Sequence, residues 1–129
     1  MVDTKDYLQW LAKAENDLKA AKLILAGEQL YDISAFHCQQ CVEKALKAYV
    51  LYHEGIIMET HSLPRLNQRC AKHDHTFLSF ADSLHILNSF YIETRYPAVD
   101  ELIVTRANAE SAVDVANRVL EYVKNSLNA

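Results

Sequence analysis

The chain contains very little glycine and proline, with two of each among its 129 residues. A β-sheet protein with many tight turns needs more of both, so their scarcity favours long helices. It also excludes a glycine-rich phosphate-binding loop, because Gly27 and Gly55 are the only glycines and stand far apart in the sequence. Half of the residues are hydrophobic, which is enough to form the core of one domain.

Long hydrophobic runs are missing as well. No apolar stretch approaches the ~18 residues that a membrane-spanning helix needs. The first residues, MVDTKDYLQW, lack the basic and then apolar regions of a secretory signal. The three cysteines are an odd number without the spacing of a disulfide framework, which suits a reducing compartment better than secretion. We therefore expect a cytoplasmic protein with no membrane association.

Charge of neither sign is concentrated in one segment. The formal net charge is −4 and the basic residues are scattered, so no surface for duplex DNA is expected, although a small basic pocket is compatible with this composition. Carboxylates such as Glu15, Asp17 and Glu43 are dispersed over predicted helices, without the convergence of a general acid–base pair. The sequence therefore predicts no catalytic residues.

Apolar residues recur with helical spacing from residue 4 to residue 26. They stand alternately four and three positions apart, which places them on one helix face: Tyr7, Leu11, Ala14, Leu18, Ala21 and Leu25. Asp3 or Thr4 is predicted to cap the start of this helix, and Gly27 is predicted to end it in a left-handed conformation.

The rest of the chain predicts further helices. Each begins at a residue that can cap a first turn, namely Asp32 or Ser34, Ser62, Thr76, and Thr105 or Asn108. The fourth helix must end before Pro97, because the residue before a proline avoids the helical region, and residues 92–104 are predicted to form an extended connection. We expect an all-α fold, an up-down bundle of four to five helices in a single domain over residues 1–129.

The second predicted helix, which ends near Glu54, is apolar over more than half of its circumference, so we place it at the centre of the bundle. Its remaining side carries a polar stripe with spacings of three, four and three, formed by His37, Gln40, Lys44 and Lys47. A polar stripe on a central helix is a candidate functional feature.

The same helix contains a Cys-x-x-Cys motif, Cys38 to Cys41. A redox pair of the thioredoxin type needs a preceding strand and a cysteine at the start of a helix, and neither is predicted here. A structural zinc site needs a second pair of ligands, for which His73 and His75 are the nearest candidates. The helical spacing instead places both cysteines on the apolar face, so we predict two core thiols, no metal and no cofactor.

Five motifs occur in a fixed order along the chain. They are WLAKA at 10–14, YD at 31–32, FHCQQCVEKALKA at 36–48, THSL at 60–63 and RYP at 95–97. Together they resemble the HEPN domain family (higher eukaryotes and prokaryotes nucleotide-binding) over nearly the whole sequence. Members of this family usually carry alanine where Cys41 stands, which agrees with a core position for this cysteine.

The resemblance implies a bundle of four or five helices that commonly forms a homodimer. The roles associated with the family are nucleotide binding, partnership with a minimal nucleotidyltransferase, and RNA cleavage in toxin–antitoxin pairs. The ribonuclease branch uses an Arg-x4-His motif. In this chain no histidine stands five residues after any of the arginines, Arg65, Arg69, Arg95, Arg106 and Arg118. The resemblance therefore implies a branch that lacks this catalytic pair.

Two interpretations of the polar residues remain open. A nucleotide needs cations for its phosphates and a planar surface for its base, which the candidate nucleotide-binding residues offer together: His37, Gln40, Lys44, Lys47, Arg95 and Tyr96. Alternatively these residues are structural, with Glu43 and Lys47 paired on a solvated helix face and His37 an ordinary hydrogen-bonded histidine.

We expect a non-catalytic HEPN-like protein that binds a nucleotide or an RNA end and acts with a separately encoded minimal nucleotidyltransferase. One alternative is a divergent ribonuclease that uses Arg69 with His73 or His75, or Arg95 with His37. Another is a module that only docks a second protein. A homodimer is also expected from apolar residues outside the main stripes of the first two helices: Trp10, Leu23, Ile24, Val50 and Leu51.

Overall fold

The computed structural model describes residues 2–27, 29–91, 97 and 103–129. Within these ranges the chain forms α-helices, one 3-10 helix and no strand, which confirms the predicted all-α class. The elements are, in chain order, α1 (Tyr7–Ala26), α2 (Tyr31–Glu54), α3 (Leu63–Ala71), η1 (His75–Phe80), α4 (Ala81–Asn88) and α5 (Arg106–Leu127).

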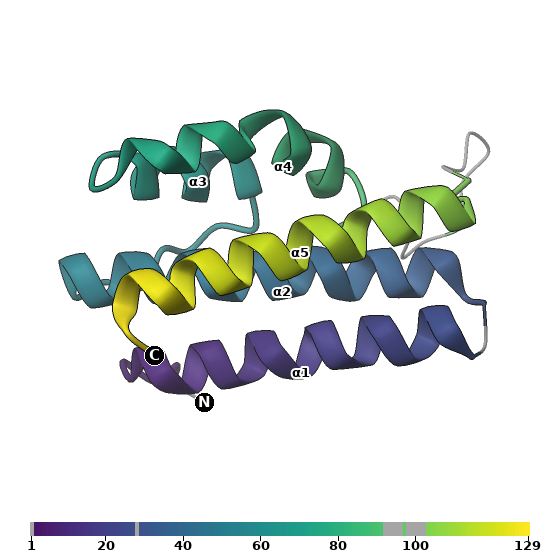
Figure 1. The fold of residues 1–129 in the computed structure, drawn as a ribbon. Coiled ribbons are helices and arrows are strands. Elements are labelled where there is room, and N and C mark those ends of the chain that lie inside the picture. The colour runs from purple at the N-terminus through teal and green to yellow at the C-terminus, as the bar shows by residue number, and fades with distance from the viewer. Residues whose placement is uncertain (1, 28, 92–96, 98–102) are drawn as a thin grey trace.

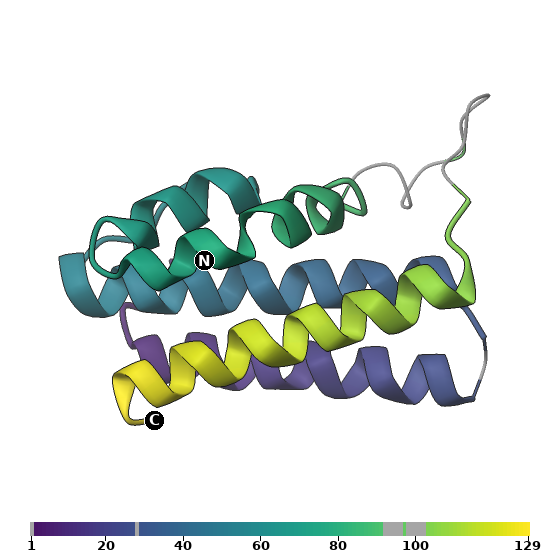
Figure 2. The same cartoon turned by 45° about the horizontal axis from the view of Figure 1, so that its top comes forward.

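The three long helices run side by side, with α2 packed against both α1 and α5 (Figure 1). The shorter elements α3, η1 and α4 cover the other side of α2 and α5, away from α1, and the rotated view shows the same two layers (Figure 2). The central position predicted for the second helix is therefore confirmed. It leaves α2 able to contact polar groups from α1 on one side and from the segment before α3 on the other.

The middle of the apolar stripe of α1 is confirmed, since Leu11, Ala14, Leu18 and Ala21 are buried, whereas Tyr7 and Leu25 at its two ends are half-buried. Both predicted ends of this helix were wrong in detail. The capping side chain is Asp6, which accepts a hydrogen bond from the backbone N–H of Leu8 at 3.0 Å.

At the other end, Gly27 has a φ of −106° and stays in the right-handed region. The left-handed residue is Gln29, with a φ of 57°, because the chain reverses two residues later than predicted. By contrast, Gly55 ends α2 with a φ of 71° and donates to the carbonyl of Leu51, as the usual left-handed cap does.

Two of the later helix starts agree with the sequence and two do not. α2 begins at Tyr31 after Leu30, without the side-chain cap that was predicted at Asp32 or Ser34. Ser62 caps α3 and Thr105 caps α5 in a reciprocal capping box with Asn108. The predicted fourth helix is instead a 3-10 helix capped by Asp74, which continues into α4. Of the extended connection predicted for residues 92–104, segments 92–96 and 98–102 lie outside the described residues.

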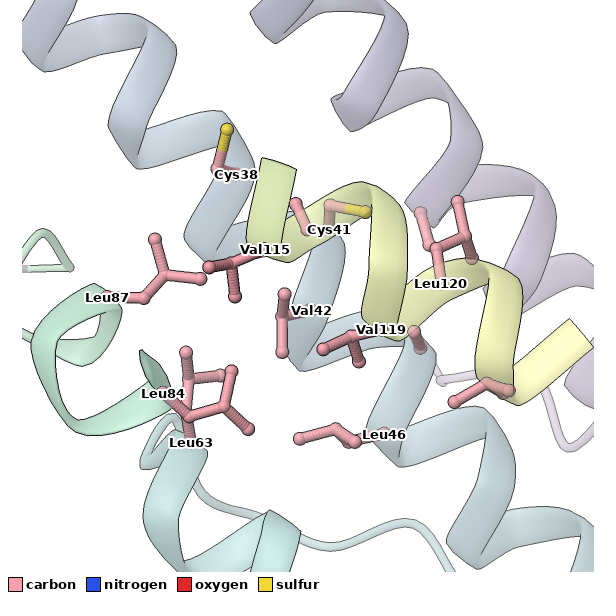
Figure 3. Packing of buried hydrophobic residues seen from close by; sticks show 14 of the residues in the cluster. Cys38, Cys41, Val42, Leu46, Leu63, Leu84, Leu87, Val115, Val119 and Leu120 are labelled. Atoms are coloured by element: carbon pink, nitrogen blue, oxygen red, sulfur yellow. The ribbon is translucent and has the colours of Figure 1, made fainter. Parts of the chain in front are cut away.

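The core lies where α2, α5 and the α3–α4 layer meet. Figure 3 shows side chains from all of these elements converging there, among them Val42, Leu46, Leu63, Leu84, Leu87, Val115 and Val119. Cys38 and Cys41 are fully buried in the same cluster, which confirms the prediction of two core thiols. Burial raises the pKa of Cys38 to about 12 and shifts the pKa of Cys41 upward as well, so neither is a reactive thiolate.

Val50 and Leu51 are also buried, with exposed fractions of 0% and 5%. Both side chains pack inside a single chain. They are therefore not exposed apolar surface that a second copy could cover, and this part of the argument for a homodimer was wrong. Leu23, in contrast, is 67% exposed on α1.

None of the described helices is sufficiently long and apolar to cross a membrane.

Candidate functional site

The polar stripe of α2 is divided between two clusters of side chains, each built around one carboxylate. We call them the Asp17 network, formed by Asp17, His37 and Lys44, and the Glu43 network, formed by Gln39, Gln40, Glu43, Lys47 and His61. The sequence-predicted residues His37 and Lys44 belong to the first, and Gln40 and Lys47 to the second.

The Asp17 network joins α1 to α2. Asp17 Oδ1 lies 3.0 Å from His37 Nδ1, and its Oδ2 accepts a hydrogen bond from Lys44 Nζ. His37 and Lys44 are seven residues, or two helical turns, apart on α2, so both reach the same carboxylate from one helix face. The Lys44 side chain remains 27% exposed and that of His37 31% exposed. Two basic groups that share one carboxylate and keep contact with solvent can also bind an anion.

The Glu43 network lies deeper in the protein. Glu43 is only 4% exposed and Lys47 only 7%. Glu43 Oε2 accepts a hydrogen bond from Lys47 Nζ at 3.1 Å, and Oε1 lies 3.3 Å from Gln39 Nε2. The Glu43–Lys47 pair is therefore buried and does not lie on a solvated face, so this part of the structural interpretation was wrong. A buried charge of this kind is tolerated only while its partner is present.

Gln40 joins this network through Gln39, because Gln40 Nε2 donates to Gln39 Oε1 at 2.7 Å. His61 connects the network to the surface. Its Nδ1 lies 3.1 Å from Glu43 Oε2, its ring stacks on Tyr91 with centroids 4.7 Å apart, and its side chain is 60% exposed. The carboxylate of Glu43 thus contacts Gln39 and Lys47 on α2 and His61 in the loop before α3, and Gln40 is joined to it through Gln39.

Sequence reasoning did not identify Asp17 as the partner of His37 and Lys44. It treated this carboxylate as one of several dispersed along the helices, because the register of α1 against α2 is not encoded in the spacing of either helix. Arg95 and Tyr96, the two remaining candidates, lie outside the described residues.

A third carboxylate has a similar set of partners at the end of α2. Arg69 Nε lies 2.9 Å from both carboxylate oxygens of Glu54, and His73 Nε2 lies 2.7 Å from Oε2. The imidazole of His73 stacks on that of His53 with centroids 4.9 Å apart. Hydrogen bonds from Arg69 and then His73 lower the pKa of Glu54 to about 2, whereas burial and the neighbouring His73 lower the pKa of His53.

These contacts bear on the ribonuclease alternative. Arg69 and His73 do lie together, as that alternative requires, but both are bound to Glu54. To contact a phosphodiester, the guanidinium of Arg69 must either release the carboxylate of Glu54 or bind the carboxylate and the phosphodiester at the same time.

Among the described residues, no group of three or more histidine, cysteine, aspartate or glutamate side chains has an arrangement that could hold a metal ion. The imidazole and thiol groups of the predicted zinc alternative are instead spread between the core and the α3–η1 connection.

Comparison with known proteins gives consistent matches. A family model described as the HEPN domain matches residues 7–126. A protein of Methanocaldococcus jannaschii named "Putative toxin MJ1304" is 30% identical over 134 residues, covering 92% of this chain and 86% of that protein.

Solved structures agree with the family match. TT1696 from Thermus thermophilus superposes with a TM-score of 0.85 at 28% identity, and ST0689, an archaeal HEPN homologue, with a TM-score of 0.77 at 26% identity. Both comparisons cover 95% of this chain and 98% of the other.

Proposed function

This chain belongs to the HEPN domain family, and we propose that it binds a nucleotide or an RNA end through the face of α1 and α2 that carries the Asp17 network. It acts, in this proposal, beside a separately encoded minimal nucleotidyltransferase and performs no chemistry by itself. The similarity to a protein named as a toxin is compatible with a role in a toxin–antitoxin pair.

The observation that carries the proposal is the arrangement around Asp17. Lys44 has three N–H donors and directs one of them to Asp17, which leaves two for a ligand on its exposed side. When His37 Nδ1 donates to Asp17, Nε2 of the neutral ring accepts a hydrogen bond and can contact a ribose hydroxyl. A phosphate placed beside Lys44 gains charge-assisted hydrogen bonds without first breaking a buried network.

The other sequence candidates have different parts in the proposal. Lys47 and Gln40 hold the buried side of the face in place through the Glu43 network, since the ammonium of Lys47 is committed to Glu43. Arg95 and Tyr96 are proposed to complete the site from the connection before α5, on the strength of the RYP motif alone.

Calorimetric titration with ATP and GTP in the presence of magnesium tests this proposal. Lys44→Ala is expected to weaken binding tenfold or more, which corresponds to about 1.4 kcal/mol. Lys124→Ala is a matched control, because Lys124 is also 27% exposed and also paired with a carboxylate, that of Glu15. Equal losses in the two variants, or no heat with the unmodified protein, would contradict the proposed binding face.

A second candidate function is a divergent ribonuclease, favoured by the proximity of Arg69 and His73 around Glu54. Incubation of the purified protein with labelled RNA, beside the Arg69→Ala variant, separates the two proposals. RNA cleavage that disappears in this variant would replace the binding-only proposal, whereas intact RNA with both proteins would remove the ribonuclease.

The proposed functional unit is a homodimer. This proposal comes from the family resemblance, and the 67% exposed side chain of Leu23 on α1 is one apolar group at which a second copy can pack. Light scattering at micromolar concentration is expected to give twice the mass of one chain, and a monomer under these conditions would contradict the proposal.

A further inference from the structure

Beside Lys44, the chain preceding α1 and the first turns of this helix border a cavity of about 170 Å³ that is open to solvent. We infer that this cavity holds the base of a bound nucleotide, with the indole of Trp10 as the stacking surface. The inference rests on the proposed function and assigns it a specific subsite. The cavity is lined by Asp3, Thr4, Gln9, Trp10, Lys13 and Lys44.

Trp10 is held in place before any ligand arrives. Its indole N–H donates to the backbone carbonyl of Thr4 at 2.8 Å, which satisfies the only polar atom of the side chain. The ammonium of Lys47 lies over the ring, 5.8 Å from its centroid. A fixed aromatic ring that borders a cavity can stack on a base with little loss of side-chain entropy.

The charged groups that line the cavity are Lys13, Lys44 and Asp3. Because Lys44 is already paired with Asp17, Lys13 is the lysine of the cavity that can contact an anionic ligand without sharing a carboxylate. Lys13 is exposed and forms no ion pair with any residue in the described part of the chain. An aromatic ring next to one lysine without an ion pair, Lys13, and one that keeps two further N–H donors, Lys44, matches the two chemical parts of a nucleotide, a planar base and a phosphate.

The cavity is small. Pockets that take up whole small molecules usually have volumes of roughly 300–1,000 Å³, so we place one base in this open cavity and the rest of the nucleotide outside it. Lys44 belongs both to the cavity and to the Asp17 network. The phosphate is therefore placed outside the cavity, between Lys13 and Lys44. In this proposal the terminal nucleotide of an RNA strand binds in the same way, with its base in the cavity.

The single tryptophan of the chain provides a direct readout. Trp10 fluorescence, excited at the red edge of indole absorption, is followed during titration with AMP and, separately, with ribose 5-phosphate, which has no base. AMP is expected to quench the emission in a saturable way, and ribose 5-phosphate to bind at least tenfold more weakly without quenching. Unchanged Trp10 emission at AMP concentrations that calorimetry shows to be saturating would overturn the inference and leave the proposed function intact.

Three variants support this measurement. Trp10→Leu is expected to lower the affinity for AMP at least tenfold, whereas Tyr52→Leu, which removes an exposed aromatic ring outside the cavity, changes it less than twofold. Lys13→Ala removes only an exposed side chain and is expected to weaken AMP binding about threefold, even if Trp10→Leu fails to fold.

Circular dichroism establishes that each variant keeps its helices. AMP affinity unchanged by both Trp10→Leu and Lys13→Ala would overturn the subsite. A complete absence of AMP binding to the unmodified protein would contradict the subsite and the proposed function together.

Discussion

The Asp17 network and the Glu43 network share the same ionisable groups, and the Glu43 network has two amide side chains, Gln39 and Gln40, in addition. In each, one carboxylate contacts one lysine of α2 and one histidine. The two differ in burial, because the lysine side chain is 27% exposed in the Asp17 network and 8% exposed in the Glu43 network. The cost of separating a charge pair rises steeply as water is excluded. The same ionisable groups therefore form a network around Lys44 that can exchange its carboxylate for a ligand. Around Lys47, three residues further along α2, they form a buried network that stabilises the fold.

The most severe test of this difference removes one negative charge from each network. Glu43→Gln leaves the ammonium of Lys47 buried without a counter-charge, and we expect it to lower the free energy of unfolding by about 3 kcal/mol. Asp17→Asn, the matched change in the more open network, is expected to cost less than about 1 kcal/mol. Urea denaturation of the two variants measures both values, and equal losses would show that burial does not distinguish the networks.

Much of the fold was predictable from local patterns. The stripe of Leu11, Ala14 and Leu18 predicted the buried face of α1, and the capping positions of Ser62 and Thr105 were correct. The errors occurred where tertiary contacts decide the conformation. The 3-10 helix after Asp74 and the late chain reversal at Gln29 both depend on how the connecting segments pack, which local propensity does not encode.

The candidate site was only partly predictable for the same reason. Helical spacing identified the stripe from His37 to Lys47, but the division of the stripe depends on which elements cover each side of α2. Asp17 arrives from α1, and His61 from the loop before α3. Both contacts require the relative placement of elements far apart in the sequence, so a single sequence does not reveal them.

A smaller effect is expected on the nucleotide affinity of the Asp17→Asn variant. Asp17→Asn leaves Lys44 and His37 without their shared carboxylate, which makes the face more positive. One unit charge at about 4 Å contributes roughly 1 kcal/mol in water, so nucleotide affinity is expected to rise about fivefold. Calorimetry with ATP measures this change. A lower affinity in Asp17→Asn would mean that the carboxylate orients the site and does not compete with the phosphate.

A further expected effect, on the pH dependence of stability, concerns Glu54, the third carboxylate with one basic side chain and one histidine as partners. Its pKa of about 2 in the folded protein is below the ordinary value of 4.5, so its contribution to stability is present above about pH 4.5. This contribution is lost as the pH falls through that window towards pH 2.

Glu54→Gln lacks this contribution and is therefore expected to show a weaker decline in stability between pH 4.5 and pH 2 than the unmodified protein. Thermal unfolding at a series of pH values measures the two slopes. Parallel curves would mean that the pair with Arg69 does not stabilise the fold.

The central claim, that the open network binds the ligand while the buried network holds the fold, is tested most directly by comparing Lys44→Met with Lys47→Met. Nucleotide affinity and the free energy of unfolding are measured for both variants under the same conditions. Lys44→Met is expected to lose at least tenfold in affinity with a stability change below about 1 kcal/mol, and Lys47→Met to lose about 3 kcal/mol of stability while retaining its affinity within threefold. The reverse pattern, with affinity lost in Lys47→Met and kept in Lys44→Met, would contradict the account.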